Sequence, residues 1–391
     1  LNQNIKDIKE YVHKRIEFLK EDQQVTVYDG QIEIVSDVER EFISYKNKQG
    51  ISLPEIKKQI EEILQNSLSL SFKYKAGPSI PIEWSYNDDK RWGKPGGILV
   101  KVFPFKGMED QIANLESESA NHKETIYVIP TSIDDIEEKI VEIEKTEKAI
   151  NTFQSDKSSE KFNDIRSKYE SIIKEKFKEL GREIRSALDK GIIIYNYTKT
   201  DVNGRLEDSI REMINSNVIS NYYPNITSQT ASIEDVKKVL KEPKGKLYSI
   251  RSDNDHAVFD KDGELIEGHK LINHISQFIK KNTRGSYIID NFTRSPYGWT
   301  QETIMYAVAA MIRSGKILVN ESDDYSDSQI ISIMTTPANF KNANFSLTHS
   351  ISIEEKEAIL KLFNEIEEDR LEIGDPNSKF LKWLPFQIGR A

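Results

Sequence analysis

The sequence predicts an α+β protein that is mostly helical. Two observations predict the helices: long charged segments carry apolar residues at helical spacing, and glycine, proline and serine stand where such segments begin or end. A third observation predicts β-structure, because residues 70–105 are rich in aromatic residues, alternate in part and are broken by turn signals.

We expect four units along the chain. They are a domain of helices with a small β-sheet (1–130), a charged antiparallel helical hairpin of coiled-coil type (131–190), a helical domain with a winged-helix-like module (191–336) and a C-terminal helical segment (337–391). The length of 391 residues is typical of two or three domains. Aromatic residues make up 9% of the chain, which argues against disorder throughout.

The overall charge and the absence of cysteine exclude several classes of function. A net charge of −9 gives no general attraction to nucleic acid, although a local basic surface stays open. Without cysteine there is no disulfide framework, thiolate zinc site or cysteine nucleophile, and a reducing cytoplasm fits this composition. No apolar run approaches the roughly 20 residues that span a bilayer, so we expect a cytoplasmic protein without a membrane partner. Because Leu1 is not an initiator methionine, we expect a piece of a longer protein.

The first 130 residues predict helices followed by strands. Residues 1–27 have the spacing of one charged helix. The stretch "DVEREFISYKNKQGISLPEIKKQIEEILQNSL" predicts two helices, with Gly50 ending the first, Ser52 capping the second and Pro54 in its opening turn. Residues 70–105 then predict strands joined by turns, and "TIYVIP" (125–130) predicts a buried strand.

Residues 131–190 predict two long helices joined by a serine-rich loop. Apolar residues repeat in steps of three and four on both sides of "NTFQSDKSSE", at Ile133, Ile136, Ile140, Ile143 and Ile150 and then at Phe162, Ile165, Tyr169, Ile173, Phe177, Leu180, Ile184 and Leu188. This is the seam of a coiled-coil-like hairpin. Its many charges are most simply a solvated face; the alternative is a stalk that binds a partner or a second copy of the chain.

After residue 190 the pattern becomes that of shorter elements. Helices are expected at 204–218 and 232–241, and a short hairpin around Asp262-Gly263. Two helices follow in "HKLINHISQFIKKN" and "SYIIDNFT", and Thr300 caps a third (301–314) that ends at Gly315. "KILV" and "QIISIM" then predict two strands, which gives three helices and a β-hairpin, the winged-helix arrangement.

No catalytic, cofactor-binding or metal-binding residue is predicted. "GKPGG" (93–97) and "SGKIL" (314–318) both lack the remaining residues of a P-loop. "DKDGE" (260–264) fails as a calcium loop, since His269 would stand where glutamate is required. His269 and His274 lack a carboxylate that would complete a metal site.

Segment 269–319 carries a basic island in an acidic chain. Its seven bases outnumber its two acids, a balance of +5. The residues that we expect to contact DNA or a partner are Lys280, Lys281, Arg284, Arg294, Arg313 and Lys316. The third helix is apolar on two faces, however, and the expected wing is acidic, with Glu321, Asp323, Asp324 and Asp327. Packing against protein is therefore the preferred interpretation, and direct DNA binding the alternative.

The turn "RSPYGW" precedes the third helix. We expect Pro296, Tyr297, Gly298 and Trp299 to form a structural corner, with Pro296 and Gly298 shaping it and Trp299 filling the core beside it.

With "PYGW", a helix and "GKI", the sequence resembles the C-terminal region of the large P-loop ATPases of BREX phage-resistance systems (the BrxC/PglY type). The order of parts agrees with that of this family. The two helices expected in "DVEREFISYKNKQGISLPEIKKQIEEILQNSL" come first, and "FKYKAGPSIPIEWSYNDD", "TIYVIP", the charged hairpin and "PYGW" follow. The resemblance covers nearly the whole chain and corresponds to the region downstream of the ATPase domain. It implies an ATPase that acts with a DNA methyltransferase, a phosphatase-like protein and small subunits to block phage. Since the ATP-binding motifs are absent here, ATP and Mg²⁺ are expected only in an upstream domain, and this chain has an assembly or DNA-proximal role.

Overall fold

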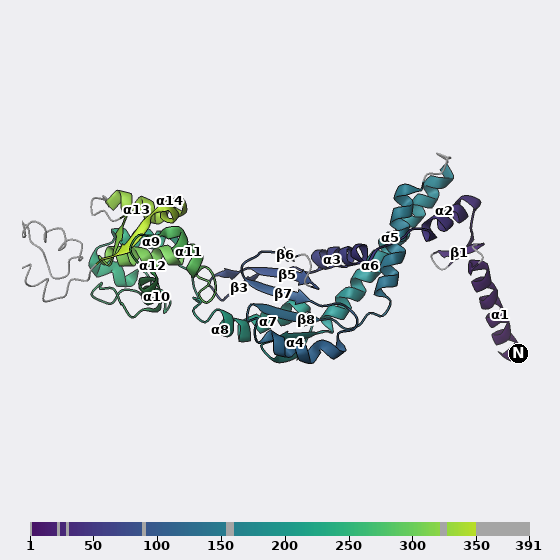
Figure 1. Ribbon diagram of the computed structural model, residues 1–391, viewed down its shortest axis with the longest axis horizontal. Coiled ribbons are helices and arrows are strands. Elements are labelled where there is room, and N and C mark those ends of the chain that lie inside the picture. Colours follow the sequence, from purple (N-terminus) through teal and green to yellow (C-terminus); the bar gives the residue numbers. More distant parts are fainter. Residues whose placement is uncertain are drawn as a thin grey trace, which may run out of the picture.

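The computed structural model describes residues 2–21, 24–28, 31–87, 91–153, 160–320 and 327–348, and its class is mixed α and β with more helix than strand, as predicted. The molecule is elongated (Figure 1). Helix α1 (Asn2–Glu21) lies at one end, a six-stranded sheet in the middle, and a second, smaller helical core at the other end.

The N-terminal arm differs from the expected single helix over 1–27. Helix α1 ends at Glu21, and strands β1 (Val25–Tyr28) and β2 (Gln31–Ile34) pair as an antiparallel hairpin. Val25 and Val27 are β-branched and alternate with polar or aromatic neighbours, which favours a strand over a further helical turn.

Helices α2 (Asp37–Asn47) and α3 (Leu53–Ser67) confirm the predicted pair. The α3 cap is as predicted: the Ser52 amide N–H donates to the Glu55 carboxylate at 2.7 Å, and Pro54 lies in the first turn. Helix α2 ends three residues before Gly50, with Lys48 at its cap, so Gly50 belongs to the connection and does not terminate the helix.

The central sheet has six strands in the order β10-β9-β8-β7-β5-β6. Strands β5, β7 and β8 run parallel, and β6, β9 and β10 are antiparallel to their neighbours. The strands of this sheet and of the small β3-β4 ladder beside it are β3 (Phe72–Lys73), β4 (Ser79–Ile80), β5 (Ile82–Tyr86), β6 (Arg91–Gly93), β7 (Ile98–Val102), β8 (Thr125–Ile129), β9 (Ile192–Tyr195) and β10 (Thr198–Asp201).

Strand β8 is buried on both faces because the sheet is covered on both sides. Ile126 and Val128 point into the larger core, which contains α3 and the helices described next, whereas Tyr127 and Ile129 pack with Leu115 of α4 (Ile112–Ser119) on the opposite face. The short 3-10 helix η1 (Glu109–Gln111) precedes α4. The buried strand predicted from "TIYVIP" is thus confirmed.

Helices α5 (Ile136–Thr152) and α6 (Glu160–Asp189) form the predicted hairpin. Ion pairs link Lys139 to Glu183 (2.7 Å) and Glu142 to Lys176 (3.7 Å), so residue numbers rise along one helix as they fall along the other. The helices therefore run antiparallel. Near their tip they pack on α2, where Phe42 is fully buried, its ring centroid 4.7 Å from that of Tyr169.

The chain after the hairpin returns to the same sheet. Strands β9 and β10 extend it, and α7 (Leu206–Met213), the π-helical turn η2 (Ile214–Val218) and α8 (Ile219–Tyr222) complete the larger core, whose last member is Ile226. The expected boundary at residue 190 therefore cuts through one sheet. The hairpin is an insertion into this domain, because β8 and β9, which flank it, are hydrogen-bonded neighbours.

A second, smaller core begins at Ala231 and includes Phe345. Its elements are α9 (Ile233–Lys241), η3 (Lys244–Ser249), α10 (Lys270–Phe278), β11 (Thr283–Arg284), α11 (Gly285–Phe292), α12 (Gln301–Arg313), β12 (Ile317–Val319), α13 (Asp327–Thr335), α14 (Pro337–Asn342) and β13 (Asn344–Leu347). The helices predicted for 232–241 and 269–314 are confirmed. Thr300 caps α12 by accepting from the Thr303 amide, and Gly315, with φ +67°, follows its last turn.

The predicted strand "QIISIM" is wrong. These residues lie in helix α13, and the strand that pairs with β12 is β13, in a three-stranded sheet of order β11-β13-β12. Because β13 belongs to this sheet, the expected boundary at residue 336 also divides one structural unit. The loop acids Glu321, Asp323 and Asp324, and the expected terminal helix after residue 348, lie outside the described residues.

The expected hairpin at Asp262-Gly263 is reduced to a turn. A single bridge joins Phe259 to Leu265, and the Asp260 carboxylate accepts from the amides of Asp262 and Glu264. Gly263 has φ +75°, a conformation that favours glycine at this point of the turn.

Candidate functional site

The structure divides the predicted basic island between two kinds of environment. Lys280, Lys281 and Arg284 are exposed in and just before strand β11. Arg284 donates to the side-chain oxygen of Asn342 at 2.8 Å, which fixes it beside α14. These three residues form a short basic segment on the surface of the C-terminal core.

The remaining three bases are placed elsewhere. Arg313 donates to the backbone carbonyl of Glu242 (3.3 Å), just after α9, and Lys316 is ion-paired with Glu267 at 2.6 Å. Arg294 is exposed in the turn that follows α11. Arg313 and Lys316 therefore bind groups of this same chain and are only partly exposed, whereas Lys280, Lys281 and Arg284 are exposed at the surface.

Helix α12 is buried along most of its length. The nine successive residues from Thr303 to Met311 are each at most 1% exposed. Helix α9 packs along α12, and α10, α11 and α13 surround it. A helix that reads bases must expose polar side chains to a groove, and α12 cannot do so in this fold.

The corner at residues 295–299 joins the two cores. The Ser295 hydroxyl donates to the Tyr222 carbonyl (2.6 Å), and the Asn225 amide donates to the Pro296 carbonyl (3.0 Å). The Ser295–Pro296 peptide bond is cis. These bonds fasten the corner to the segment that ends the larger core, so the "PYGW" residues lie at the junction of the two cores.

Trp299 anchors this corner in the smaller core. It is 1% exposed and stacks on Phe292, with ring centroids 4.9 Å apart and an interplanar angle of 4°. Its indole N–H donates to the Asn225 carbonyl at 2.7 Å. Gly298 has φ +63°, and a Cβ there would meet the Tyr223 ring at 3.0 Å, so the turn needs glycine for both conformation and space. The Tyr297 hydroxyl lies 3.4 Å from His274 Nδ1.

A buried polar cluster lies next to α12. His256 Nδ1 is 2.7 Å from Asp253 Oδ1, and His256 Nε2 is 3.5 Å from the Thr303 hydroxyl. This order of groups resembles that of a nucleophile, base and orienting acid. His256 and Thr303 are both fully buried, however, and the Thr303 hydroxyl also accepts the Ala231 amide. No substrate can reach it, so the cluster is structural.

The electrostatics of this cluster agree with a structural role. Burial lowers the pKa of His256, outweighing the favourable effect of Asp253 on its charged form. For Asp253, burial alone would raise the pKa, but hydrogen bonds from His256 and Arg251 outweigh it and lower that pKa. The sequence contains "RSDNDH", but no spacing in it distinguishes a buried cluster from an ordinary polar loop, which is why it was missed.

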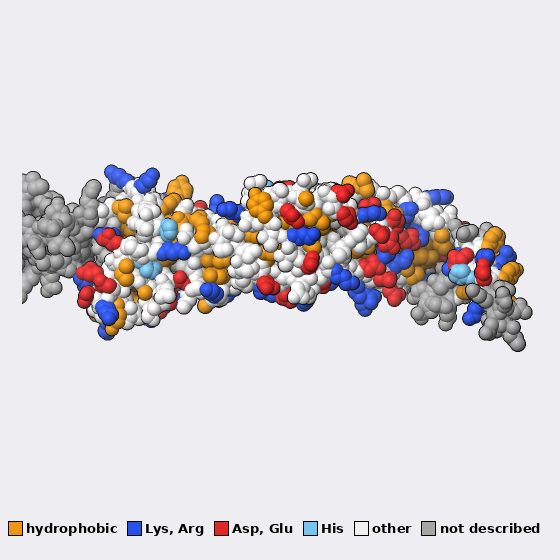
Figure 2. Space-filling model, turned by 90° about the horizontal axis from the view of Figure 1, so that it is seen from below, with side chains coloured by type: hydrophobic (Ala, Val, Ile, Leu, Met, Phe, Trp, Pro, Cys, Tyr) orange, Lys and Arg blue, Asp and Glu red, His pale blue; other side chains and the backbone are white. Residues whose placement is uncertain are grey.

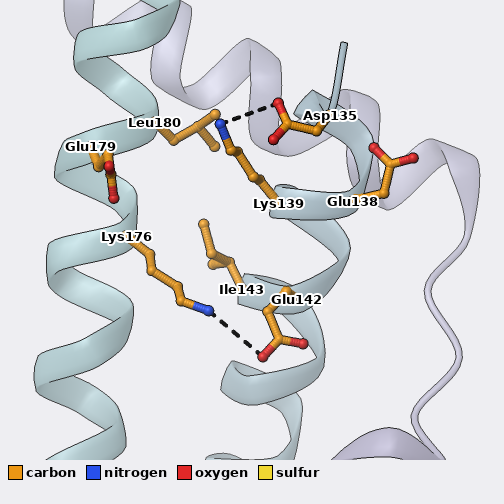
Figure 3. Close-up of a pocket in the computed structure, with 8 residues that line it drawn as sticks. All are labelled: Asp135, Glu138, Lys139, Glu142, Ile143, Lys176, Glu179 and Leu180. Carbon is orange, nitrogen blue, oxygen red and sulfur yellow. Dashed lines mark ion pairs between the residues drawn. The ribbon is translucent and has the colours of Figure 1, made fainter. Parts of the chain in front are cut away.

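A hollow of about 360 Å³ lies between the two helices of the hairpin (Figure 3). Ile143 and Leu180 lie between the helices. Lys139 forms an ion pair with Asp135 of its own helix, whereas Lys176 of α6 forms one with Glu142 of α5, across the hollow. Glu138 and Glu179 stand exposed at its rim. On the face drawn in Figure 2, acidic side chains gather most densely where Figure 1 places α5 and α6.

The described part of the chain offers no metal centre: no three His, Asp or Glu side chains in it converge on a metal-sized site. Within those same residues, no helix is both long enough and apolar enough to cross a membrane. The features that remain as functional candidates are the surface of the helical hairpin, the basic segment at β11 and the corner between the cores.

No protein-family model matches the chain, and neither a curated protein nor a solved structure matches it.

Proposed function

We propose that this chain is a non-catalytic assembly region of a BREX anti-phage defence ATPase, which helps to hold that ATPase in a complex with the DNA methyltransferase machinery. The resemblance in motif order supplies the family. The observation that carries the role is the burial of α12: the helix best placed to enter a DNA groove is instead the centre of a core, which favours protein contacts over base reading.

The proposal includes a winged-helix-like origin for the C-terminal core. The elements that correspond to a winged helix follow one another as α10, β11, α11, α12, β12 and β13, and in the sheet β13 lies between β11 and β12. Helices α13 and α14 are inserted between β12 and β13, where a winged helix has its wing. With α9 covering α12, such a module acts as a packing unit.

The helical hairpin is the surface that we assign to partner binding, with the methyltransferase and the phosphatase-like protein as partners. It projects from the central sheet, and its rim glutamates, Glu138 and Glu179, are exposed. Antiparallel pairing of this hairpin with a second copy is the other use that its charged surface would allow.

Co-purification tests the assembly role. The tagged chain is co-expressed with the other BREX subunits, and recovery of those subunits is measured for the natural chain and for Glu138→Lys/Glu179→Lys. We expect the double variant to lose most of the recovered partner. Lys199→Glu, a charge reversal on the exposed strand β10, is the matched control and should retain it. Equal recovery with both variants would remove the hairpin from the proposal, and no recovery with the natural chain would reject the assembly role.

Direct DNA binding is the second candidate, and the exposed segment Lys280, Lys281 and Arg284 is the observation that favours it. Binding through phosphates should weaken steeply as salt rises. Replacing all three residues by glutamine should reduce the slope of log K against log salt by about 2 to 3, since each phosphate contact contributes about 0.9. Arg313→Gln, whose native side chain is bound to Glu242, is the control. Absence of duplex binding at low salt in a mobility assay rejects this candidate.

A further inference from the structure

A further cation joins the basic segment at β11 in the folded chain. Lys341 lies in the last turn of α14 and is exposed. Its neighbour Asn342 accepts the hydrogen bond from Arg284 at 2.8 Å. The two helices meet closely here, since a Cβ on Gly285 would overlap the Phe340 carbonyl oxygen (Figure 1). The end of α14 is therefore packed on the start of α11, which brings Lys341 to the surface that carries the basic segment.

The described part of the chain does not neutralise the charge of this surface. Within it, none of Lys280, Arg284 and Lys341 forms an ion pair, in contrast to Lys316. Arg284 is also the N-cap residue of α11, where its side chain makes no capping bond, and the first turn of this helix contains no acid. Because the start of a helix carries partial positive charge, a cation there is unfavourable unless an anion lies beside it. The surface therefore fits an anionic ligand.

An exposed aromatic ring stands beside these cations. Tyr287 is the third residue of α11, and it is 64% exposed. The N-cap and the third residue of a helix lie next to one another, so the Tyr287 ring neighbours Arg284. The single acid of α11, Asp290, lies almost one turn further along. A ring among cations is the arrangement with which proteins hold unpaired nucleotides, because the base stacks on the ring while the phosphates bind the cations.

We propose that the basic segment, Lys341 and Tyr287 together bind single-stranded nucleic acid, with one base stacked on the Tyr287 ring and the neighbouring phosphates on the cations. An acidic protein segment would match the cations but has no use for the ring, and a duplex keeps its bases stacked on one another. The inference rests on the basic segment of the second candidate function. It goes beyond that function because it assigns a different ligand and two further residues.

The test measures the binding of labelled oligonucleotides to the whole chain by fluorescence anisotropy at low salt. The first probe is an oligothymidylate of about 16 nucleotides, which spans the site sizes of such surfaces. The second is an abasic strand of the same length, which keeps the phosphates but has no bases, and the third is a duplex of that length. The oligothymidylate should bind at least about fivefold more tightly than the other two, because it alone offers unpaired bases to the ring.

Substitutions separate the ring from the cations. Tyr287→Ala should weaken oligothymidylate binding by about five- to a hundredfold and leave binding of the abasic strand unchanged, whereas Tyr287→Phe keeps the ring and should retain both. Tyr197→Ala is the matched control, because Tyr197, between β9 and β10, is 65% exposed. Lys341→Gln should reduce the slope of log K against log salt by about 0.7, the contribution of one phosphate contact to a single strand. Lys199→Gln, on strand β10, should leave that slope unchanged.

Equal affinity for the oligothymidylate and the abasic strand would overturn the inference, as would a Tyr287→Ala variant that binds like the natural chain. If that variant failed to fold, the comparison of the two strands would decide alone. Displacement of the oligothymidylate by oligoglutamate of equal charge would identify an acidic protein segment as the ligand and would also overturn it.

Two results separate this inference from the proposed functions. A duplex bound as tightly as the oligothymidylate would overturn the inference and leave the second candidate function in place. No binding of the oligothymidylate at low salt would overturn the inference and leave the assembly role untouched, because co-purification with BREX subunits tests that role independently.

Discussion

Trp299 connects the two cores through both parts of its side chain. The ring stacks on Phe292 inside the smaller core, and the indole N–H reaches the Asn225 carbonyl next to the last residue of the larger core. Gly298 and the Ser295 hydroxyl bring the chain close enough to the 222–225 segment for this contact. At the residue scale, residues 295–299 therefore join the two cores and do not form a catalytic site.

Substitutions of Trp299 should separate the contribution of its ring packing from that of its hydrogen bond to the Asn225 carbonyl. Trp299→Ala removes a buried ring and should lower the free energy of unfolding of the smaller core by about 3–5 kcal/mol. Trp299→Phe keeps most of the packing but leaves the Asn225 carbonyl unpaired, and should cost about 1–3 kcal/mol. Chemical denaturation followed by circular dichroism measures both. Equal losses from the two variants would show that the hydrogen bond to Asn225 dominates.

Acid should destabilise the smaller core. Burial lowers the pKa of His256, His269 and His274 in the folded state, and all three residues lie in this part of the chain. Below the unfolded value of about 6.5 the unfolded chain binds more protons than the folded one, so stability present above pH ~6.5 is lost as the pH falls towards the folded pKa values. Each histidine contributes at most about 1.4 kcal/mol per pH unit in that range.

Denaturant unfolding at pH 7.5 and pH 5.5 checks this expectation. The midpoint for the smaller core should be lower at pH 5.5, and the difference should shrink in His274→Gln, which removes one titrating group at the partly exposed side of α10. A midpoint that rises on acidification would contradict the assignment of lowered pKa values.

Among the elements, α3 shows how a local signal and the tertiary fold agree. The Ser52–Glu55 capping pair starts the helix, and Ile56, Ile60 and Leu64 then pack into the larger core. A hydrogen bond from Lys148 and those from Ser52 lower the pKa of Glu55 to about 2. The cap therefore also links α3 to α5 of the hairpin.

Ser52→Ala should weaken the larger core by about 1 kcal/mol, the usual effect of removing an N-cap hydroxyl. The change should appear as a lower denaturation midpoint with an unchanged slope. Ser52→Thr keeps the hydroxyl and is the control. A midpoint for Ser52→Ala that is indistinguishable from that of the natural chain would show that the backbone amide bond to Glu55 suffices.

Helix α13 shows the opposite case, in which tertiary packing overrides a local pattern. "QIISIM" is rich in β-branched residues and resembles a strand, yet it is helical and packs against α9 and α14. The position beside β12 is taken by β13, whose Phe345 is fully buried. Which strand pairs with β12 depends on contacts across the whole sheet, so the spacing of residues near β12 does not predict it.

At the scale of the whole molecule, the two cores have no buried apolar residue in common. The junction between them includes the 222–230 segment and the corner at 295–299, and Lys270 and Asp255 also bond to that segment. We therefore expect two unfolding transitions. In a thermal or denaturant scan, Trp299→Phe should lower one transition and Ser52→Ala the other. A single transition that responds equally to both variants would show that the junction couples the cores completely.

Several features of this protein could be determined from the sequence by itself. The helical hairpin, the caps of α3 and α12, the buried strand β8 and the apolar character of α12 all depend on spacing of three, four or two residues, or on one capping side chain. The basic residues were also visible, but their division between the exposed segment at β11 and the bonds to Glu242 and Glu267 was not.

Only the tertiary structure decided which distant segments share a core. Strands β8 and β9 pair although about 60 residues separate them, β13 completes the sheet with β11 and β12, and the 295–299 corner binds the 222–225 segment. A cavity of about 480 Å³ beside the sheet edge likewise needs β3 and β6 to meet. Such contacts minimise exposed apolar surface and unpaired backbone groups over the whole chain, a balance that local spacing does not encode.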